Sequence, residues 1–459
     1  MEWNPRSPRG DRPAYLELAE AIADDVRRGS LPPGTRLPTQ RALARRLGVT
    51  PGTVARGYLE AERRGLIEGQ VGRGTFVREG RSSTAGPLRV EPPTTDADLS
   101  INHPPTGPGS EVAEHLASGL ATIASSEGLA DLLHLQPARG AESHRARAAE
   151  WIGRRLPDTA ADDLLICSGG QHALAVALDT LCRPGDAVAC ERYTYGGLIQ
   201  LARARGIELV AIDQDDYGMQ PDALERALSN RRVRAVYCNP TLQNPTTAVM
   251  PPARRREIAA IVERHDLALI EDDVYGILHG TLESGSPAPI CSSIPERSMY
   301  LSNAGKSLAP GLRVGFLRAP RDRMEEVARH VQDNCWSVAP LMVELITRWI
   351  ADGTADRIVA RRRVESSERL ELARRFLGPW SFAAHPHGFH LWLALPDPWN
   401  AADFVTAAAS EGVRLTPTEA FVADGSAPPQ RIRLSLGREG STESLAAALE
   451  RVAALLERS

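Results

Sequence analysis

The sequence predicts an α/β protein made of two folded parts, a small helical head and a larger body with a mainly parallel sheet wrapped by helices. Residues 1–78, the head, contain three helical hydrophobic patterns followed by two short β-like runs. In residues 99–459, the body, short apolar runs alternate with helical patterns, which is typical of a parallel sheet. Residues 79–98 are rich in Ser, Thr, Pro and Gly without periodicity, so we expect a flexible linker.

Charge is unevenly distributed between the head and the body. The chain has 459 residues, of which 42% are hydrophobic and 24% charged, as in an ordinary globular protein. Of its 54 basic and 58 acidic residues, 14 and 10 fall in residues 1–80, a balance of +4, and the other 40 and 48 give −8. A basic head suggests that an anionic polymer such as double-stranded DNA binds there.

The composition disfavours several classes of protein. Apolar stretches stay well short of about 18 residues, so we expect no membrane span. The first residues, MEWNPRSPRG, lack the apolar run of a signal peptide. The six cysteines form no CxxC pair and no metal-ligand spacing with histidine, so we expect them to be buried apolar residues in a reducing compartment. We therefore predict a cytoplasmic protein without a metal site.

The head begins with two predicted helices. The first has apolar residues at helical spacing from Tyr15 to Val26. The turn segment LPPGTRLP follows it. Thr39 is suited to cap a second helix that contains Leu43 and Leu47, and Gly48 is suited to end it.

A third helix and a hairpin complete the predicted head. Thr50 and Pro51 provide an N-cap and a first-turn proline. We expect this helix to direct three residues into the core, namely Val54, Tyr58 and Leu59. Two β-like runs, 66–68 and 75–77, are joined by a glycine-rich turn. Three helices and a small hairpin make a winged helix-turn-helix.

In such a module the N-terminal residues of the third helix contact base edges in the major groove. The residues expected there are Thr50, Thr53 and Arg56, and Gly52 is expected to allow close approach to the DNA. Residues expected at phosphates, at the entry to the second helix, are Arg36, Thr39 and Arg41, and Arg73 in the wing is expected to reach phosphate or the minor groove. Each of these arginines, taken alone, is equally explained as a solvated surface charge.

The head resembles the DNA-binding domain of the GntR family. The matching stretches are LPPGTRLPTQRALARRLGVTPGTVARGYLEAERRGLI and GRGTFV, within Pro13–Val77. Gln40 stands where that family usually has Glu, a difference that we expect to be tolerated.

In the body, five apolar runs are candidate strands, and polar residues follow several of them. The runs are 164–167, 187–190, 233–238, 267–270 and 298–302. Open α/β sheets bind ligands at the carboxyl ends of their strands. We therefore expect a site where CSGGQHAL, NPTLQNPTT, IEDDVYG and LSNAGKSLAPGLRVGF meet.

Lys306, in the last of these segments, is the only lysine in the chain, against 53 arginines. A lysine amine can lose its proton and attack a carbonyl, whereas a guanidinium stays charged. The count favours a position that requires a nucleophilic amine, although chance survival in an arginine-rich chain would give the same number.

These segments together contain what pyridoxal phosphate requires. Lys306 would hold the aldehyde as an internal aldimine, and Asp272 would keep the ring nitrogen protonated. Hydrogen bonds to the phenolic oxygen are expected from Tyr275 and Asn244. The remaining candidate contacts are Gly170, Gln171 and Arg313 for the phosphate and Tyr195 for stacking on the ring.

The body resembles a fold-type I, class I aminotransferase domain, through SGGQ, QNP, DDVY, the lysine segment and APGLRVG in that order. A GntR-type head joined to such a body is similar to the MocR subfamily of regulators. The resemblance implies a smaller α+β C-terminal subdomain, a homodimer with sites at the subunit interface, and heads that dock on the partner. It also implies that an effector carboxylate binds Arg433, with Arg431 as the competing candidate.

This sequence departs from the family before the lysine. The family usually has hydroxyl residues three and one positions earlier, and this chain has Asn303 and Gly305. We expect fewer phosphate contacts or substitutes in Asn303 and Ser307, and less efficient proton transfer by Lys306.

Three functions are consistent with these observations. The first is a transcription regulator that senses an amino compound through aldimine chemistry at Lys306. The second is an aminotransferase that carries a DNA-binding head, with Lys306 as general base. The third is a sensor of pyridoxal phosphate itself. We do not expect a physiological enzyme, although residual aminotransferase activity is compatible with the sequence.

Overall fold

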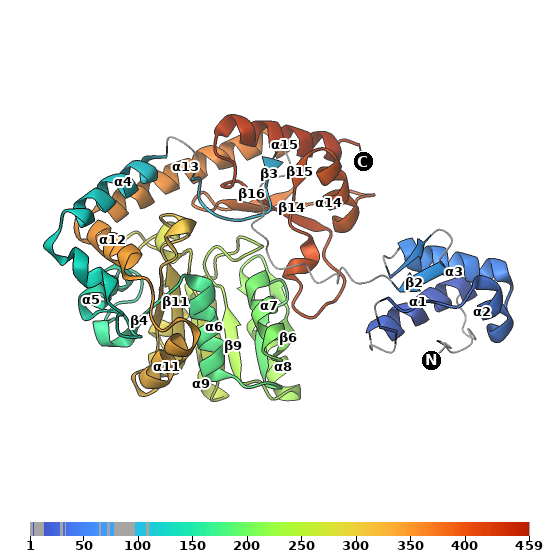
Figure 1. Cartoon of the computed structure of the whole chain (residues 1–459), viewed down its shortest axis with the longest axis horizontal. Helices are drawn as coiled ribbons and strands as arrows, with labels where there is room; N and C mark the ends of the chain where they lie inside the picture. The colour runs from blue at the N-terminus through green and yellow to red at the C-terminus, as the bar shows by residue number, and fades with distance from the viewer. Residues whose placement is uncertain are drawn as a thin grey trace. The chain divides into compact units, whose positions relative to one another are not determined.

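The computed structural model divides into two compact units, residues 1–87 and 88–459 (Figure 1). It describes residues 3, 13–27, 31–32, 34–63, 66–70, 74–77, 97–106 and 110–458. None of the helices in these parts is long and apolar enough to cross a membrane.

The first unit has the predicted winged helix-turn-helix fold. Its elements are α1 (Ala14–Arg27), α2 (Gln40–Leu47), α3 (Pro51–Arg63), β1 (Ile67–Gln70) and β2 (Gly74–Val77). The two strands pair antiparallel. Thr39 caps α2, since its Oγ1 accepts the N–H of Ala42 at 3.3 Å, and Gly48 ends it with a φ of 68°. Thr50 begins α3 in the same way, through the N–H of Thr53 at 3.2 Å.

One core prediction in this unit was wrong. Val54 and Tyr58 are buried, but the side chain of Leu59 is 67% exposed. At about 100° per residue, Leu59 lies roughly 140° around the helix from Val54, whereas Tyr58 lies roughly 40° from it. Leu59 therefore belongs to the outer face, together with Gly52 and Arg56, which are also exposed.

Most of the expected linker, and Arg73 in the wing, lie outside the described residues. The last two linker positions form strand β3 (Ala97–Asp98), which pairs parallel with β15 (Val413–Arg414) of the second unit. Ala97 is buried in the core that contains Val413.

The second unit is built on a seven-stranded sheet with the order β4-β12-β11-β10-β9-β5-β6. The five predicted strands are present as β4 (Leu164–Cys167), β5 (Ala187–Glu191), β9 (Ala235–Cys238), β10 (Ala268–Asp272) and β11 (Ser298–Asn303). Two strands had no counterpart in the prediction, β6 (Glu208–Ile212) and β12 (Gly315–Arg318). The sheet is mainly parallel, as expected, because β12 alone runs antiparallel to its neighbours.

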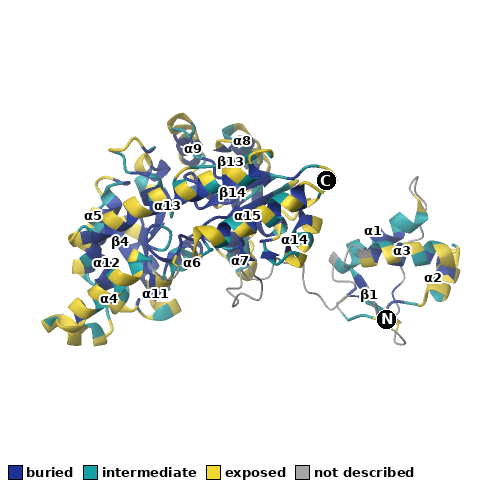
Figure 2. Cartoon of the chain, turned by 90° about the horizontal axis from the view of Figure 1, so that it is seen from above, coloured by how far each residue is buried: buried dark blue, intermediate teal, exposed yellow. Residues whose placement is uncertain are grey.

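Helices cover both faces of this sheet, and Figure 2 shows buried strands between helices whose outer faces are exposed. The helices before the C-terminal part are α4 (Glu111–Ala124), α5 (Glu142–Gly153), α6 (Gly170–Leu181), α7 (Gly196–Ala204), α8 (Pro221–Asn230), α9 (Pro252–Arg264), α10 (Gly276–His279), α11 (Met324–Cys335) and α12 (Pro340–Ala351). A short pair, β7 (Gln214–Asp215) and β8 (Gly218–Met219), lies beside β5. Five cysteines are buried, and Cys335 is partly exposed, against the expectation for all six.

The C-terminal part is a smaller α+β subdomain. Its antiparallel sheet contains β13 (Phe382–Ala384), β14 (His390–Ala394) and β16 (Arg431–Ser435). The accompanying helices are α13 (Thr354–Leu377), α14 (Ala401–Ser410) and α15 (Thr442–Leu456). A separate hydrophobic core holds this subdomain together.

Candidate functional site

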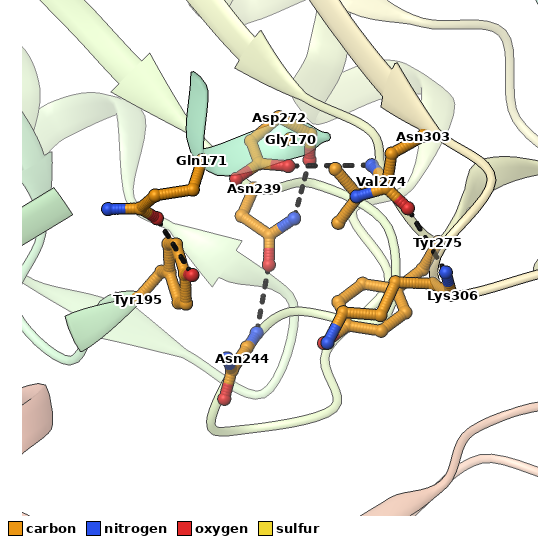
Figure 3. Close-up of a pocket in the computed structure, with 10 residues that line it drawn as sticks. All are labelled: Gly170, Gln171, Tyr195, Asn239, Asn244, Asp272, Val274, Tyr275, Asn303 and Lys306. Carbon is orange, nitrogen blue, oxygen red and sulfur yellow. Dashed lines mark hydrogen bonds between the residues drawn. The ribbon is translucent and has the colours of Figure 1, made fainter. Parts of the chain in front are cut away.

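The polar strand ends of the second unit meet in one pocket (Figure 3). Of the predicted cofactor residues, Gly170, Gln171, Tyr195, Asn244, Asp272, Tyr275 and Lys306 line it. Three further residues line it as well, Asn239, Val274 and Asn303. The parallel arrangement of β5, β9 and β10 explains this convergence, because their carboxyl ends share one edge of the sheet.

One end of the pocket is suited to an anion. Helix α6 begins at Gly170, so its first N–H groups face the pocket. Gly169 has a φ of 84°, and a Cβ there would lie 3.0 Å from the guanidinium of Arg313. Arg313 is itself held in place, because its Nη2 donates to the carbonyl oxygen of Ser168 at 2.9 Å. The absence of a side chain at Gly169 thus lets the guanidinium of Arg313 lie close to the N-terminus of α6.

Asp272 is a buried carboxylate without a cationic partner among the described residues. The hydroxyl of Tyr237 donates to its Oδ2 at 2.7 Å. Burial raises the pKa of Asp272 to about 6, against the opposing effect of the Tyr237 hydrogen bond. Its neighbour Asp273, in contrast, is paired with an arginine: Arg155 Nε lies 3.1 Å from Oδ2 of Asp273.

Lys306 follows β11, and its side chain lines the pocket. Its main-chain N–H donates to Oδ1 of Asn303 at 3.0 Å, and its Nζ donates to the carbonyl oxygen of Asn102. Figure 3 shows the Lys306 side chain alongside the ring of Tyr275. Its Nζ lies 5.5 Å from the ring centroid. Burial, followed by the charge of Arg433, lowers the pKa of Lys306 to about 8. A substantial fraction of this amine is therefore neutral near pH 7–8.

Tyr275 and Asn244 are both held by residues from other elements. Asn102 Nδ2 donates to the Tyr275 hydroxyl at 3.0 Å. Arg433 Nη1 donates to Oδ1 of Asn244 at 2.9 Å, which leaves the Asn244 amide nitrogen free to face the pocket. Arg433 is buried and its Nε has no partner among the described residues, whereas Arg431 is partly exposed.

The positions that depart from the family pattern have clear structural roles. Asn303 holds the lysine turn through its Oδ1, and its Nδ2 lies 2.7 Å from where a Cβ of Gly170 would be. Its amide therefore reaches the anion end of the pocket. The Ser307 hydroxyl is buried, with no partner in the described parts of the chain. Tyr195 is the N-terminal flanking residue of α7, and its hydroxyl donates to Oε1 of Gln171 at 2.9 Å.

Besides Val274, which lies between the predicted Asp272 and Tyr275, three residues of the site were missed by sequence reasoning. Asn102 lies 204 positions from Lys306, and nothing local marks it. Tyr237 is one apolar-looking residue in a strand, and its contact with Asp272 depends on the register of β9 against β10. Asn239 is the first residue after β9, in NPTLQNP, so its position could have identified it. The sequence analysis assigned only Asn244 of this segment to the site.

The residues present fit pyridoxal phosphate. Asp272 lacks the cation that a protonated ring nitrogen would provide, and burial without one is costly. Lys306 has a partly neutral amine, and Gly170 and Gln171 at the start of α6 line the pocket. Arg313 is not among the lining residues, but its guanidinium lies against Gly169, next to Gly170. The donor set therefore matches an aldehyde, a basic ring nitrogen and a phosphate.

In the first unit, the predicted DNA-binding residues are mostly open to solvent. Arg36, Thr39, Arg41, Thr50, Gly52 and Arg56 are exposed, and Thr53 is half-buried. The hydroxyls of Thr50 and Thr53 lie 2.9 Å apart at the start of α3. Arg36 lies against Gly74 of the hairpin, since a Cβ there would come within 2.9 Å of its Nε.

Comparison with known proteins gives two family matches. The model for aminotransferase class I and II matches residues 94–452, and the model for bacterial regulatory proteins of the gntR family matches residues 14–77. A Bacillus subtilis protein named as an uncharacterized HTH-type transcriptional regulator, YdeF, is 30% identical over 446 residues, which cover 97% of this chain and 95% of that protein.

Aminotransferases match the second unit. A 2-aminoadipate transaminase of Thermus thermophilus is 30% identical over 351 residues, 72% of this chain and 84% of its own length. The solved α-aminoadipate aminotransferase of that organism, complexed with N-(5'-phosphopyridoxyl)-L-leucine, has a TM-score of 0.70 and 25% identity over 79% of this chain and 92% of that one. A Pyrococcus horikoshii kynurenine aminotransferase, at 23% identity, shares the fold with a TM-score of 0.72, over 80% of this chain and 92% of that one.

These matches cover both units in the order that the two sequence patterns predicted. The aminotransferase assignment identifies the cofactor as pyridoxal phosphate, in agreement with the donor set of the pocket. The chain therefore belongs to the class I and II aminotransferase family and, because a GntR-type DNA-binding domain precedes that region, it is a member of the MocR subfamily of GntR-family transcription regulators.

Proposed function

We propose that the protein is a DNA-binding regulator whose body holds pyridoxal phosphate at Lys306 and whose DNA affinity responds to an amino compound reaching that site. One observation carries the proposal. A partly neutral amine, Lys306, shares a pocket with a buried carboxylate, Asp272, that has no cationic partner among the described residues.

We assign each pocket residue one role toward the cofactor. Bound pyridoxal phosphate supplies an aldehyde that captures amines and a ring that withdraws electrons. Lys306 would hold the aldehyde, Asp272 would face the ring nitrogen, and Tyr275 and Asn244 would donate to the phenolic oxygen. The phosphate would bind N–H groups of Gly170 and Gln171 and the guanidinium of Arg313, and the ring of Tyr195 would stack on the cofactor ring.

Arg433 indicates which amines would be sensed. Nη1 and Nη2 of its buried guanidinium donate to Asn244 and Ser100, and its Nε, which has no partner among the described residues, suits a carboxylate of the arriving molecule. The effector would then be an amino acid or a related amino compound with an acidic group. Such a ligand can switch the protein only by binding one state of the body more tightly than the other.

An aminotransferase with a DNA-binding head is the second candidate. The 30% identity to a 2-aminoadipate transaminase favours it, and Lys306 has a pKa suited to moving a proton near neutral pH. Asn303 and Gly305 stand where the family usually has hydroxyls beside the lysine, which argues for sensing rather than turnover. A third candidate is a sensor of pyridoxal phosphate alone.

We also propose a homodimer and two domain boundaries. Leu133 and Leu135, which are 86% and 78% exposed, support a surface that a second copy covers. The DNA-binding domain would end near residue 78, and the cofactor-binding domain would begin before Ala97, since β3 pairs with β15.

The test uses the full-length, cofactor-loaded protein, titrated with a panel of amino acids and amines while absorbance and DNA binding are followed in parallel. A spectral change that alters DNA affinity without release of an oxo acid supports amine sensing. Stoichiometric oxo acid, with conversion of the cofactor to its amine form, supports the aminotransferase. DNA affinity that depends on cofactor and ignores every amine supports the third candidate.

A further inference from the structure

Asn239 ties together two parts of the pocket that are separate in sequence. It follows β9 and lines the pocket. Its Oδ1 accepts the main-chain N–H of Asn244 at 2.9 Å, and its Nδ2 donates to the carbonyl oxygen of Asp272. One amide side chain thus holds the main chain at both residues assigned to the cofactor ring (Figure 3).

Asn239 is in turn held by a hydrogen bond from its main-chain N–H to the side chain of Glu191. Glu191 ends β5, is fully buried, and accepts the main-chain N–H of Asn239 at its Oε1, 3.0 Å away. The thiol of Cys238 donates to the same oxygen at 3.4 Å. The second oxygen, Oε2, has no partner among the described residues.

The buried charges around this sheet edge single out Glu191. Asp273 pairs with Arg155 at 3.1 Å, and Glu271 lies 3.6 Å from Arg255 and accepts two main-chain N–H groups. Asp272 faces the pocket. Glu191 forms no salt bridge in the described parts of the chain, and burial raises its pKa to about 7. A buried carboxyl with an unsatisfied oxygen is unfavourable for folding alone, which suggests a role in the site above it.

We infer that Glu191 and Asn239 are positioning residues of the cofactor site, in which Glu191 fixes Asn239 and Asn239 holds Asn244 and Asp272 in place for the cofactor's phenolic oxygen and ring nitrogen. The inference rests on the roles proposed above for Asn244 and Asp272. It extends the site by one layer into the protein, to a carboxyl that is not among the residues lining the pocket.

The test follows the absorbance of the cofactor-loaded full chain against pH, with no amine and no DNA present. A donor to the phenolic oxygen favours its deprotonated form, so a displaced Asn244 raises the pH midpoint of the spectral change. We expect Asn239→Ala and Glu191→Ala each to raise the midpoint by roughly half a pH unit and to weaken cofactor binding about fivefold. Glu191→Gln keeps an acceptor oxygen for the Asn239 N–H and should restore the wild-type midpoint.

Glu271→Ala is the matched control, since Glu271 is equally buried in β10 of the same sheet and its side chain bonds to Ile290, Cys291 and Arg255, none of which lines the pocket. It should lower thermal stability and leave the midpoint unchanged. The inference is overturned if Asn239→Ala leaves the midpoint at its wild-type value, and this variant decides the matter should Glu191→Ala fail to fold. Asn244→Ala separates the two levels: if it shifts the midpoint and the others do not, only this inference fails; if it has no effect, the proposed role of Asn244 fails too.

Discussion

The head and the body present their functional residues in opposite ways. In the head, the candidate DNA contacts Arg36, Arg41 and Arg56 are exposed. In the body, Lys306, Asp272 and Arg433 are enclosed, and burial moves the pKa of each. Exposed arginines acquire a function when a polyanion arrives, and nothing within the head distinguishes them from solvated charges. Burying the charged groups of the body is unfavourable for the protein by itself. The shifted pKa values that result identify the site even when no ligand is bound.

The largest effect should come from the buried amine. Lys306→Ala removes the only lysine, so the body should lose the visible absorbance of covalently held cofactor completely. Spectra of the purified variant at saturating pyridoxal phosphate measure this. In the wild type, borohydride reduction and peptide mass analysis should place the label on Lys306, with the N-terminal amine as the only competing site. A variant that keeps the band would show that another group holds the cofactor.

Two neighbouring aspartates of the body allow a buried charge with an ion-pair partner, Asp273, to be compared with one that has none among the described residues, Asp272. Asp273→Asn leaves the buried Arg155 without its carboxylate and should cost about 3–5 kcal/mol of unfolding free energy. Asp272→Asn removes no protein ion pair, and Asn can still accept from Tyr237, so the cost should be about 1 kcal/mol. The Asp272→Asn variant should nevertheless lose the wild-type absorbance spectrum of the bound cofactor and the response of that spectrum to amines. Denaturant unfolding of the cofactor-free variants checks the first pair of values, and equal losses of stability would contradict the assignment.

The enclosed amine also predicts a pH dependence. Capture of the aldehyde needs the neutral form of Lys306, whose pKa is lowered to about 8. The rate at which cofactor-free protein takes up pyridoxal phosphate should therefore fall roughly tenfold per pH unit below 8 and level off above it. Stopped-flow absorbance measures the rate. A rate that keeps rising toward pH 10 would mean that the amine has the pKa of an exposed lysine.

The same contrast explains how much could be predicted from sequence. Asp272 ends a strand, and Tyr275, Asn244 and Lys306 follow strands, so chain order and the rule for strand ends sufficed. Asn102 and Tyr237 enter the site through long-range packing and strand register, which no local pattern encodes. In the head, the caps at Thr39 and Thr50 are local and were correct, whereas the facing of Leu59 depended on a helical angle that the apolar pattern alone did not fix.

An exposed head residue should act on DNA alone. Arg56→Ala should weaken operator binding by about 1–3 kcal/mol and leave the cofactor spectrum unchanged. Arg375→Ala, on the exposed face of α13, is the matched control and should change neither property. Fluorescence anisotropy with operator DNA at fixed salt gives the affinity. Loss of cofactor binding in the Arg56 variant would show that the head is required for the body's site.

The smallest predicted effect compares two hydroxyl caps of the same type, one in each region. Thr39 caps α2 in the head and Ser441 caps α15 in the body, each through a main-chain N–H within 3.3 Å. Replacing either with Ala should cost about 1 kcal/mol. In a small unit this cost should lower Tm by about 4–8 °C, and in a much larger one by less than about 4 °C. Two transitions in calorimetry, each moved by its own variant, would establish that head and body unfold separately. A single transition moved by both variants would mean that head and body unfold as one cooperative unit. Separate effects of Arg56→Ala on DNA binding and of Lys306→Ala on the cofactor could then not be explained by independent folding.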